Sequence, residues 1–187
     1  MTVLPIPQRR VAATVLACGA IGLALIPFVS TFSELLTNAA MALGLDAFLG
    51  TWIAPLEGRL AHGILALMGL RSSPDGALLS VADGGGATTV YIAWNCVGWQ
   101  TLLFLAVSMV PGLQGAYTRS SRLTAVAVGL GGLLALNVAR IAAVAVVALY
   151  FGPLAALIVH DYGTLMLAVT YLMWFWAYAF RSVLVPR

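Results

Sequence analysis

The chain has no lysine and few charged residues of any kind. Of its 187 residues, 62% are hydrophobic and only 8% are charged, and each of the nine basic residues is an arginine. A soluble domain carries about 25% charged residues, so this composition predicts an integral membrane protein. No basic cluster is dense enough to follow a phosphate backbone, and we therefore expect no nucleic-acid partner.

Cysteine and histidine are equally scarce, at two residues each. Cys18 lies in the middle of an apolar run, so we expect no disulfide between Cys18 and Cys96. One cysteine with two histidines, His62 and His160, is too small a set of ligands for a zinc site. The sequence therefore predicts no metal and no cofactor.

Four apolar stretches are long enough to predict transmembrane helices. They cover residues 11–31, 97–116, 123–150 and 164–180. Residues 32–70 are cut by four charged residues into pieces of about ten residues, which are too short to span a bilayer. This segment therefore predicts helices that lie on the membrane or enter it and return.

Residues 71–95 have a different character. Ser72 to Gly76 is typical of a turn. After it, two β-prone runs, 77–82 and 87–94, flank an Asp-Gly pair, which predicts a β-hairpin. Together these patterns predict an all-α integral membrane protein with four main transmembrane helices, short interfacial or re-entrant helices and a small extracytoplasmic β-hairpin, all in one membrane domain over residues 1–187.

The arginines indicate how such a chain is oriented. On the four-helix topology, six arginines fall on one side, with no acidic residue among them. Two arginines and all six acidic residues fall on the other side. The excess of arginine on the cytoplasmic side of membrane proteins predicts that both termini are cytoplasmic and that the hairpin is outside. We expect a multi-pass protein of the plasma (inner) membrane, in contact with its lipids.

Cys96 stands where the hairpin gives way to the apolar run 97–116. A helix that begins here would favour the thiolate form of Cys96, because its N-terminus carries partial positive charge. Asn95 is a common N-cap residue type. A lone cysteine is ordinarily a small packing residue, and it is two later residues that favour a chemical role.

Arg140 and His160 are predicted at the same membrane depth as Cys96. Arg140 lies 17 residues beyond Leu123, or roughly 26 Å along a helix that runs outward. His160 comes just before the last apolar stretch, and Asn137 shares a helix face with Arg140. Each has a plain alternative: Arg140 can extend to lipid headgroups, and His160 can sit in the wet interface. Their convergence with Cys96 on one side favours a site.

The order of these residues resembles the exosortase/archaeosortase family of membrane-embedded cysteine transpeptidases. The residues that carry the resemblance are Cys96 with Gly98, the run from Asn137 to Arg140, and His160 with Gly163. The resemblance covers about residues 55–180. The family commonly has Cys-Ser-Gly, whereas this chain has Val97 in the middle, without a hydroxyl beside the nucleophile.

The resemblance implies cleavage of C-terminal sorting signals on secreted proteins. Such a signal combines a short motif, a transmembrane helix and a basic cytoplasmic end. Cys96 would form a thioester, Arg140 would hold the oxyanion, and His160 would transfer protons. Transfer to a lipid or glycan acceptor would make the enzyme a transpeptidase, and transfer to water a protease. The implied supporting residues are Asn95, Gly98, Asn137 and Asp161.

A second function class is a non-enzymatic membrane protein, such as a small transporter or an assembly subunit of polysaccharide export. Arg140 would then bind an anionic substrate or a headgroup, and Cys96 would be incidental. A transporter is expected to place its polar residues near the midplane, at broken helices or an internal repeat. The sequence contains no such repeat.

The predicted orientation can be tested by cysteine labelling. In a cysteine-free variant, a cysteine at Gly85 is expected to react with a membrane-impermeant maleimide added to intact cells, because residues 71–95 are predicted outside. A cysteine at Ser120 is the matched control and is expected to be protected. Labelling at Ser120 with protection at Gly85 would invert the topology and move Cys96 to the wrong compartment for secreted substrates.

Overall fold

The computed structural model describes residues 34–185 of the chain, which divides into two compact units, residues 1–45 and 46–187. In the first unit the described part is a helix, Glu34–Ala42, and the turn that follows it. The predicted span 11–31 and Cys18 lie outside the described residues. The fold and the site below belong to the second unit.

The second unit opens with a helical segment. Its elements are α2 (Leu45–Phe48), the π-helical turn η1 (Leu49–Ile53) and α3 (Ala54–Leu67). Pro55 is in the first turn of α3, where its missing N–H costs nothing. The buried residues of α3 recur every three or four positions, as on one face of a helix. They are Ala54, Glu57, Gly58, Ala61 and Leu65. After α3, Gly69 takes a left-handed conformation, with φ of 79°, and the chain leaves the helix.

A three-stranded antiparallel sheet follows, in the order β1-β2-β3. Its strands are β1 (Arg71–Asp75), β2 (Leu78–Asp83) and β3 (Gly86–Tyr91). Leu79 and Val81 of β2 are buried in the core with Ile92, which follows β3, and α3 and α5 pack on the sheet. The β2–β3 turn lies at the predicted Asp-Gly pair, where the Gly85 N–H donates to Asp83 at 2.8 Å and holds the pKa of that carboxyl below its usual range.

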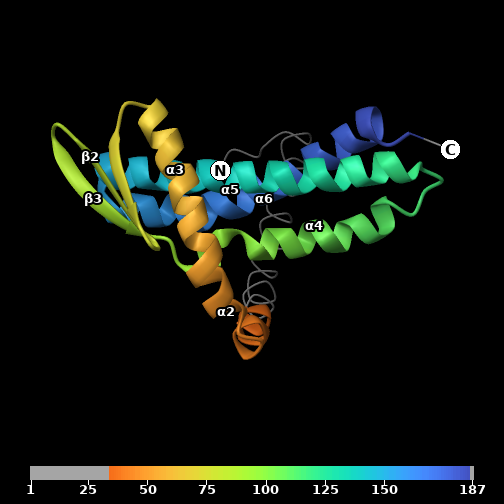
Figure 1. Cartoon of the computed structure of the whole chain (residues 1–187), viewed down its shortest axis with the longest axis horizontal. Helices are drawn as coiled ribbons and strands as arrows, with labels where there is room; N and C mark the ends of the chain where they lie inside the picture. The colour runs from red at the N-terminus through yellow and green to blue at the C-terminus, as the bar shows by residue number, and fades with distance from the viewer. Residues whose placement is uncertain (1–33, 186–187) are drawn as a thin grey trace, which may run out of the picture. The chain divides into compact units, whose positions relative to one another are not determined.

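The remaining chain is helical. Its elements are η2 (Trp94–Val97, a 3-10 turn), α4 (Trp99–Gly112), α5 (Arg119–Ile158), η3 (Val159–Gly163), α6 (Thr164–Tyr178) and η4 (Ala179–Val183). Within α5 the backbone breaks at Gly152, with φ 84° and ψ 174°, ahead of Pro153. The chain after this break runs back beside α5, so that the Tyr171 hydroxyl donates to the Gly129 carbonyl at 2.5 Å. Figure 1 shows α4, α5 and α6 side by side, with the sheet at one end of α5.

Two apolar clusters make up most of the core of this unit. One joins α3, the inner face of the sheet and the middle of α5, around Leu65, Leu79 and Ile141. The other joins α4, the first half of α5 and α6, around Leu105 and Phe175. Cys96 and Val97 pack against the first cluster. The sheet, α3 and α5 therefore fix the position of the turn that carries Cys96.

The prediction of an all-α protein with four transmembrane helices is wrong. Among the described residues, one helical stretch, Arg119–Val183, is long and apolar enough to cross a membrane, and a second exists only if Glu34–Ala42 and Leu45–Leu67 count as one broken span. The predicted spans 123–150 and 164–180 belong to that one stretch. Only 14 residues of the predicted span 97–116 form α4, which is roughly 21 Å long and shorter than a bilayer core of about 30 Å.

The predicted hairpin is also incomplete, because the sheet has a third strand. The sequence predicted a turn over Ser72 to Gly76. In the structure Arg71–Asp75 forms β1 and pairs with β2. Turn-type residues are tolerated there because β1 is an edge strand, and proline is confined to edge strands and similar positions in a sheet. Pro74 is paired opposite Leu79. The fold is therefore mixed, with a small sheet packed on helices.

The packing of α5 on α6 generates a matched pair of variants. A Cβ added at Gly132 would lie 2.6 Å from the Tyr171 hydroxyl, whereas one added at Gly131 would meet nothing within 4 Å. We expect Gly132→Ala to destabilise the fold by about 1–3 kcal/mol through overpacking. Gly131→Ala is expected to be neutral or stabilising by up to about 1 kcal/mol, because alanine is the better helix former. Thermal unfolding in detergent, followed by circular dichroism, measures both. Equal midpoints would contradict this packing of α6 on α5.

Candidate active site

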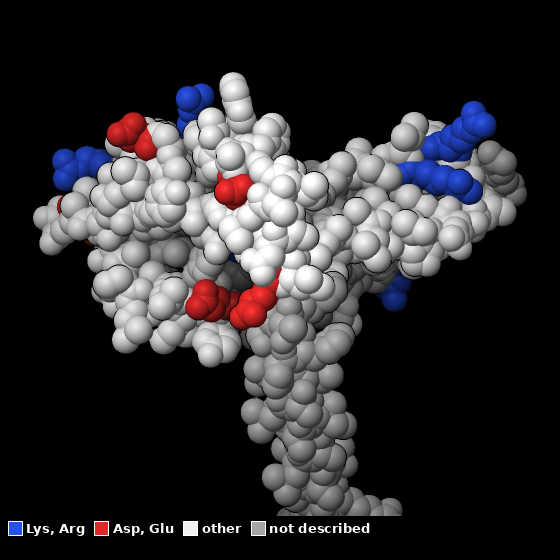
Figure 2. Space-filling view, turned by 90° about the horizontal axis from the view of Figure 1, so that it is seen from below, with Lys and Arg blue, Asp and Glu red and all other residues white. Residues whose placement is uncertain are grey.

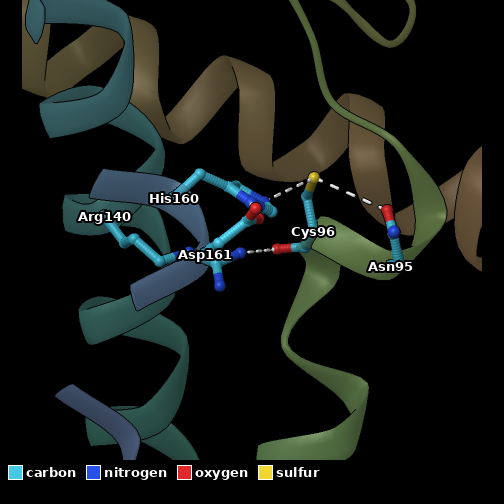
Figure 3. Close-up of polar contacts among 5 residues, drawn as sticks. All are labelled: Asn95, Cys96, Arg140, His160 and Asp161. Carbon is cyan, nitrogen blue, oxygen red and sulfur yellow. Dashed lines mark hydrogen bonds and ion pairs between the residues drawn. The ribbon is translucent and has the colours of Figure 1, made fainter. Parts of the chain in front are cut away.

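Cys96 lies on the 3-10 turn η2, between the last strand and α4. The N-cap of α4 is Gly98, in a left-handed conformation with φ 72° and ψ 16°, and no side chain caps the helix. The prediction that Asn95 caps a helix beginning at Cys96 is therefore wrong, since the helix begins at Trp99. Asn95 instead accepts a weak hydrogen bond from the Cys96 thiol, with Sγ and Oδ1 3.7 Å apart (Figure 3).

His160 reaches the thiol from η3. Its Nε2 lies 3.1 Å from Cys96 Sγ, and its Nδ1 lies 2.9 Å from Asp161 Oδ1. The reversal at Gly152 returns the chain toward Cys96, which brings together residues 64 positions apart. With the carboxylate at Nδ1, the imidazole presents Nε2 to the sulfur as a proton acceptor. The three residues form a thiol, imidazole and carboxylate relay (Figure 3).

Arg140 contacts the backbone of Cys96. Its Nη2 donates to the Cys96 carbonyl oxygen, and the same oxygen accepts from Asn137 Nδ2 at 3.1 Å. Arg140 and Asn137 are three residues apart on α5, so their side chains leave one face of the helix. Both are buried, each with 6% of its surface exposed. The carbonyl of the candidate nucleophile is thus held by two donors from a single helix.

Glu57 is the one site residue that the sequence analysis missed. It is 2% exposed on α3, and both of its carboxylate oxygens accept from Asn137 Nδ2 at 2.9 Å. Burial raises the pKa of its carboxyl to about 7, while the hydrogen bond from Asn137 and the nearby charge of Arg140 act to lower it. The signal that was present is an acidic residue on the face of α3 that carries Ala54, Ala61 and Leu65. Its partner, 80 residues away, cannot be read from spacing.

Gly98 is required by the close approach of Asn137. A Cβ at residue 98 would lie 3.1 Å from Asn137 Cγ and Oδ1. Its left-handed φ also disfavours any residue with a side chain. A side chain at residue 98 would press on Asn137, one of the two donors at the Cys96 carbonyl, and this glycine permits the turn between the nucleophile and α4.

Two small cavities border Arg140. One, of about 30 Å³, is lined by Cys96 and His160 together with the apolar residues Val90, Ile92 and Val144. A second, of about 20 Å³, lies beyond Arg140. The first cavity places an arginine, a thiol and an imidazole around one space with apolar walls. Such a space suits a carbonyl group under attack by the thiol, because charge that develops on its oxygen would be near the guanidinium.

All seven predicted site residues therefore lie in one place. The Cys96 thiol contacts His160, which in turn contacts Asp161. Asn137 and Arg140 contact the Cys96 carbonyl. Asn95 and Gly98 flank the same turn. Over residues 34–185, no group of three histidine, cysteine or acidic side chains is arranged so that it could hold a metal ion. The arrangement can deprotonate a thiol and protonate a leaving group.

No known protein family, curated protein or solved structure matches this chain.

The thiol–imidazole contact predicts the reactivity of Cys96. In a Cys18→Ser background, His160→Ala is expected to slow alkylation of Cys96 by iodoacetamide at neutral pH by about tenfold or more, because the thiol loses the acceptor for its proton and less thiolate forms. Asp161→Asn is expected to have a smaller effect in the same direction, since it alters only the orientation of the ring. Mass spectrometry of the alkylated protein over time gives the rate.

The matched control is His62→Ala. His62 lies on α3, and its Nδ1 is 2.7 Å from the Ser72 hydroxyl rather than beside the thiol. This variant is expected to be alkylated at the wild-type rate. Equal rates for His62→Ala and His160→Ala would show that His160 does not activate the thiol.

Proposed function

We propose that the protein is a membrane-embedded cysteine peptidase or transpeptidase that resembles exosortases and archaeosortases in its chemistry. The observation that carries the proposal is the relay from Cys96 Sγ to His160 Nε2, at 3.1 Å, and from His160 Nδ1 to Asp161, at 2.9 Å. Nucleophilic catalysis by a thiol needs an adjacent base and a group that orients the base. His160 is the adjacent base, and Asp161 is the group that orients it.

The first half of the reaction is acylation. His160 Nε2 takes the thiol proton, and the Cys96 thiolate attacks the scissile carbonyl carbon. The tetrahedral intermediate carries its negative charge on the former carbonyl oxygen. Its collapse breaks the carbon–nitrogen bond, His160 gives its proton to the leaving amine, and a thioester remains on Cys96.

The second half transfers the acyl group. An acceptor, which is water or a hydroxyl or amine of a lipid or glycan, gives a proton to His160 as it attacks the thioester carbon. The carbon–sulfur bond breaks, and Cys96 leaves as a thiolate that recovers the proton from His160. Asp161 stabilises the imidazolium in both halves through its contact with Nδ1.

Arg140 is proposed to stabilise the oxyanion. Arginine stays protonated at any working pH, so it donates hydrogen bonds but cannot act as a general acid. Its guanidinium borders the cavity shared by Cys96 and His160, within reach of charge that develops there. The proton transfers therefore fall to His160 and the charge stabilisation to Arg140.

A membrane location is supported by the surface of the helices in the second unit. Large apolar side chains are exposed on α4, α5 and α6, among them Val107, Leu123 and Met173, at 61%, 71% and 70%. Figure 2 shows arginines at one end of this unit with no acidic side chain beside them. That end includes Arg119, at the start of α5, and Arg181, in η4. Under the positive-inside rule, apolar flanks and a basic end would orient this unit in a membrane in the same way as a substrate tail made of an apolar helix and a basic end.

The mechanism predicts different losses in four variants. Cys96→Ala should abolish the thioester on a secreted reporter that ends in a motif, an apolar helix and arginines. Arg140→Ala should reduce its formation by about 10²–10³-fold, and Arg140→Lys should be poor because a point charge lacks the planar fork of donors. His160→Ala should lose about 10²–10⁴-fold with a peptide amide. With a peptide p-nitrophenyl ester, whose leaving group needs no proton, acylation by His160→Ala should partly recover.

Thioester formation is measured by mass spectrometry of the reconstituted protein, with release by hydroxylamine. Arg122→Ala is the matched control, since Arg122 donates to the Gly115 carbonyl away from the site. Full processing by Cys96→Ala would end the cysteine mechanism and favour a transporter or assembly subunit. Equal recovery of Arg140→Ala and His160→Ala with the ester would overturn the separate roles of the two residues.

A further inference from the structure

We infer that Glu57 is a positioning residue for the nucleophile and acts on Cys96 through Asn137. This inference rests on the proposed function, because it assigns Glu57 a part in presenting Cys96 for acylation. Glu57 lies on α3, Asn137 on α5 and Cys96 on η2, so the chain of contacts joins three elements. Neither the relay to His160 nor the oxyanion role of Arg140 uses Glu57.

The contacts run through one nitrogen atom. Asn137 Nδ2 lies 2.9 Å from each carboxylate oxygen of Glu57 and 3.1 Å from the carbonyl oxygen of Cys96. A side-chain amide has two N–H donors on that nitrogen. One is directed at the carboxylate and the other at the carbonyl, so both donors are used.

A carboxylate is the group that fixes the amide in this orientation. An ionised carboxylate only accepts hydrogen bonds, so it faces the NH₂ side of Asn137 and never its oxygen. The amide oxygen is therefore turned away from Glu57, and the second N–H is directed at Cys96. If the amide flipped, its oxygen would face the Cys96 carbonyl oxygen, and two acceptors would repel each other.

The charge of Glu57 serves the same end. Arg140 is buried with Asn137 and donates to the same carbonyl. A buried arginine is costly unless an opposite charge or hydrogen-bond acceptors accompany it. Above its pKa of about 7, Glu57 carries a negative charge that attracts Arg140, so in its ionised form it supports both donors at the Cys96 carbonyl.

A plain structural clamp between α3 and α5 would make the same contacts, and an exchange of the two side chains separates the two roles. In Glu57→Gln with Asn137→Asp, the amide and the carboxylate change places with little change in shape. The helix-to-helix hydrogen bonds can form again. The carboxylate that replaces the amide on α5 has no N–H to donate to the Cys96 carbonyl. The contact between α3 and α5 would therefore be restored, but Cys96 would lack one of the hydrogen bonds that position it.

The experiment measures stability and thiol reactivity in the same variants, all in a Cys18→Ser background. The variants are Glu57→Gln, Asn137→Asp and the double exchange, with Asp75→Asn as the control carboxylate on β1. Stability is the thermal midpoint in detergent. Reactivity is the rate of Cys96 alkylation by iodoacetamide, together with thioester formation on the reporter.

We expect Glu57→Gln to slow both reactions of Cys96 by about tenfold, the size of effect that a charged hydrogen bond commonly has. Asp75→Asn should match the wild type. Asn137→Asp should lower the thermal midpoint, because two carboxylates would then face each other. The double exchange should regain the midpoint lost in Asn137→Asp but remain about tenfold slow at Cys96.

Two results would overturn the inference. One is reaction of Cys96 in Glu57→Gln at a rate within about twofold of the wild type. The other is a double exchange that regains reactivity along with its midpoint, which would make Glu57 a structural clamp only. If Glu57→Gln does not fold, a double exchange that regains reactivity would still overturn the inference. Normal alkylation of the wild type without any thioester would count against the proposed function alone, since alkylation reports on Cys96 without a substrate.

Discussion

The arrangement of the site depends on one acceptor, the carbonyl oxygen of Cys96. It receives a hydrogen bond from Asn137 and another from Arg140, both on α5. These bonds hold the short turn η2 against a helix whose contacting residue lies 41 positions further along the chain. Because they act on the backbone, they hold the residue in place whatever the protonation state of its sulfur. The sulfur is left to exchange its proton with His160.

This polar cluster sits in an unusually apolar chain, and that setting explains its concentration. A buried charge or amide is costly unless it is fully hydrogen-bonded. With 8% of residues charged, the chain places Glu57, Asn137 and Arg140 where each satisfies another. Replacing such a cluster by packed apolar residues is often neutral or stabilising elsewhere. The cluster therefore contributes mainly by fixing the position of Cys96 rather than by stabilising the fold.

The sequence predicted the members of the site far better than it predicted the fold. Cys96, Arg140 and His160 were placed at one depth from the lengths of apolar runs, and they do lie together. The same runs gave the wrong number of spans, because hydropathy does not register where a helix begins or where a chain reverses. Gly98 delays the start of α4, and the break at Gly152 lies inside one helical stretch. Glu57 was missed because its contact joins distant elements, which no local pattern encodes.

The carbonyl and the thiol of Cys96 have separate tasks in this site: the carbonyl positions the residue, and the thiol reacts. The carbonyl faces cationic and amide donors, which keep their protons at neutral pH and so hold the backbone throughout a cycle. The thiol faces an imidazole, the side chain whose proton affinity suits exchange near neutrality. If one group did both tasks, each proton transfer would also loosen the nucleophile. Division of the tasks between α5 and η3 avoids this, because protonation of His160 changes nothing in the hydrogen bonds that position Cys96.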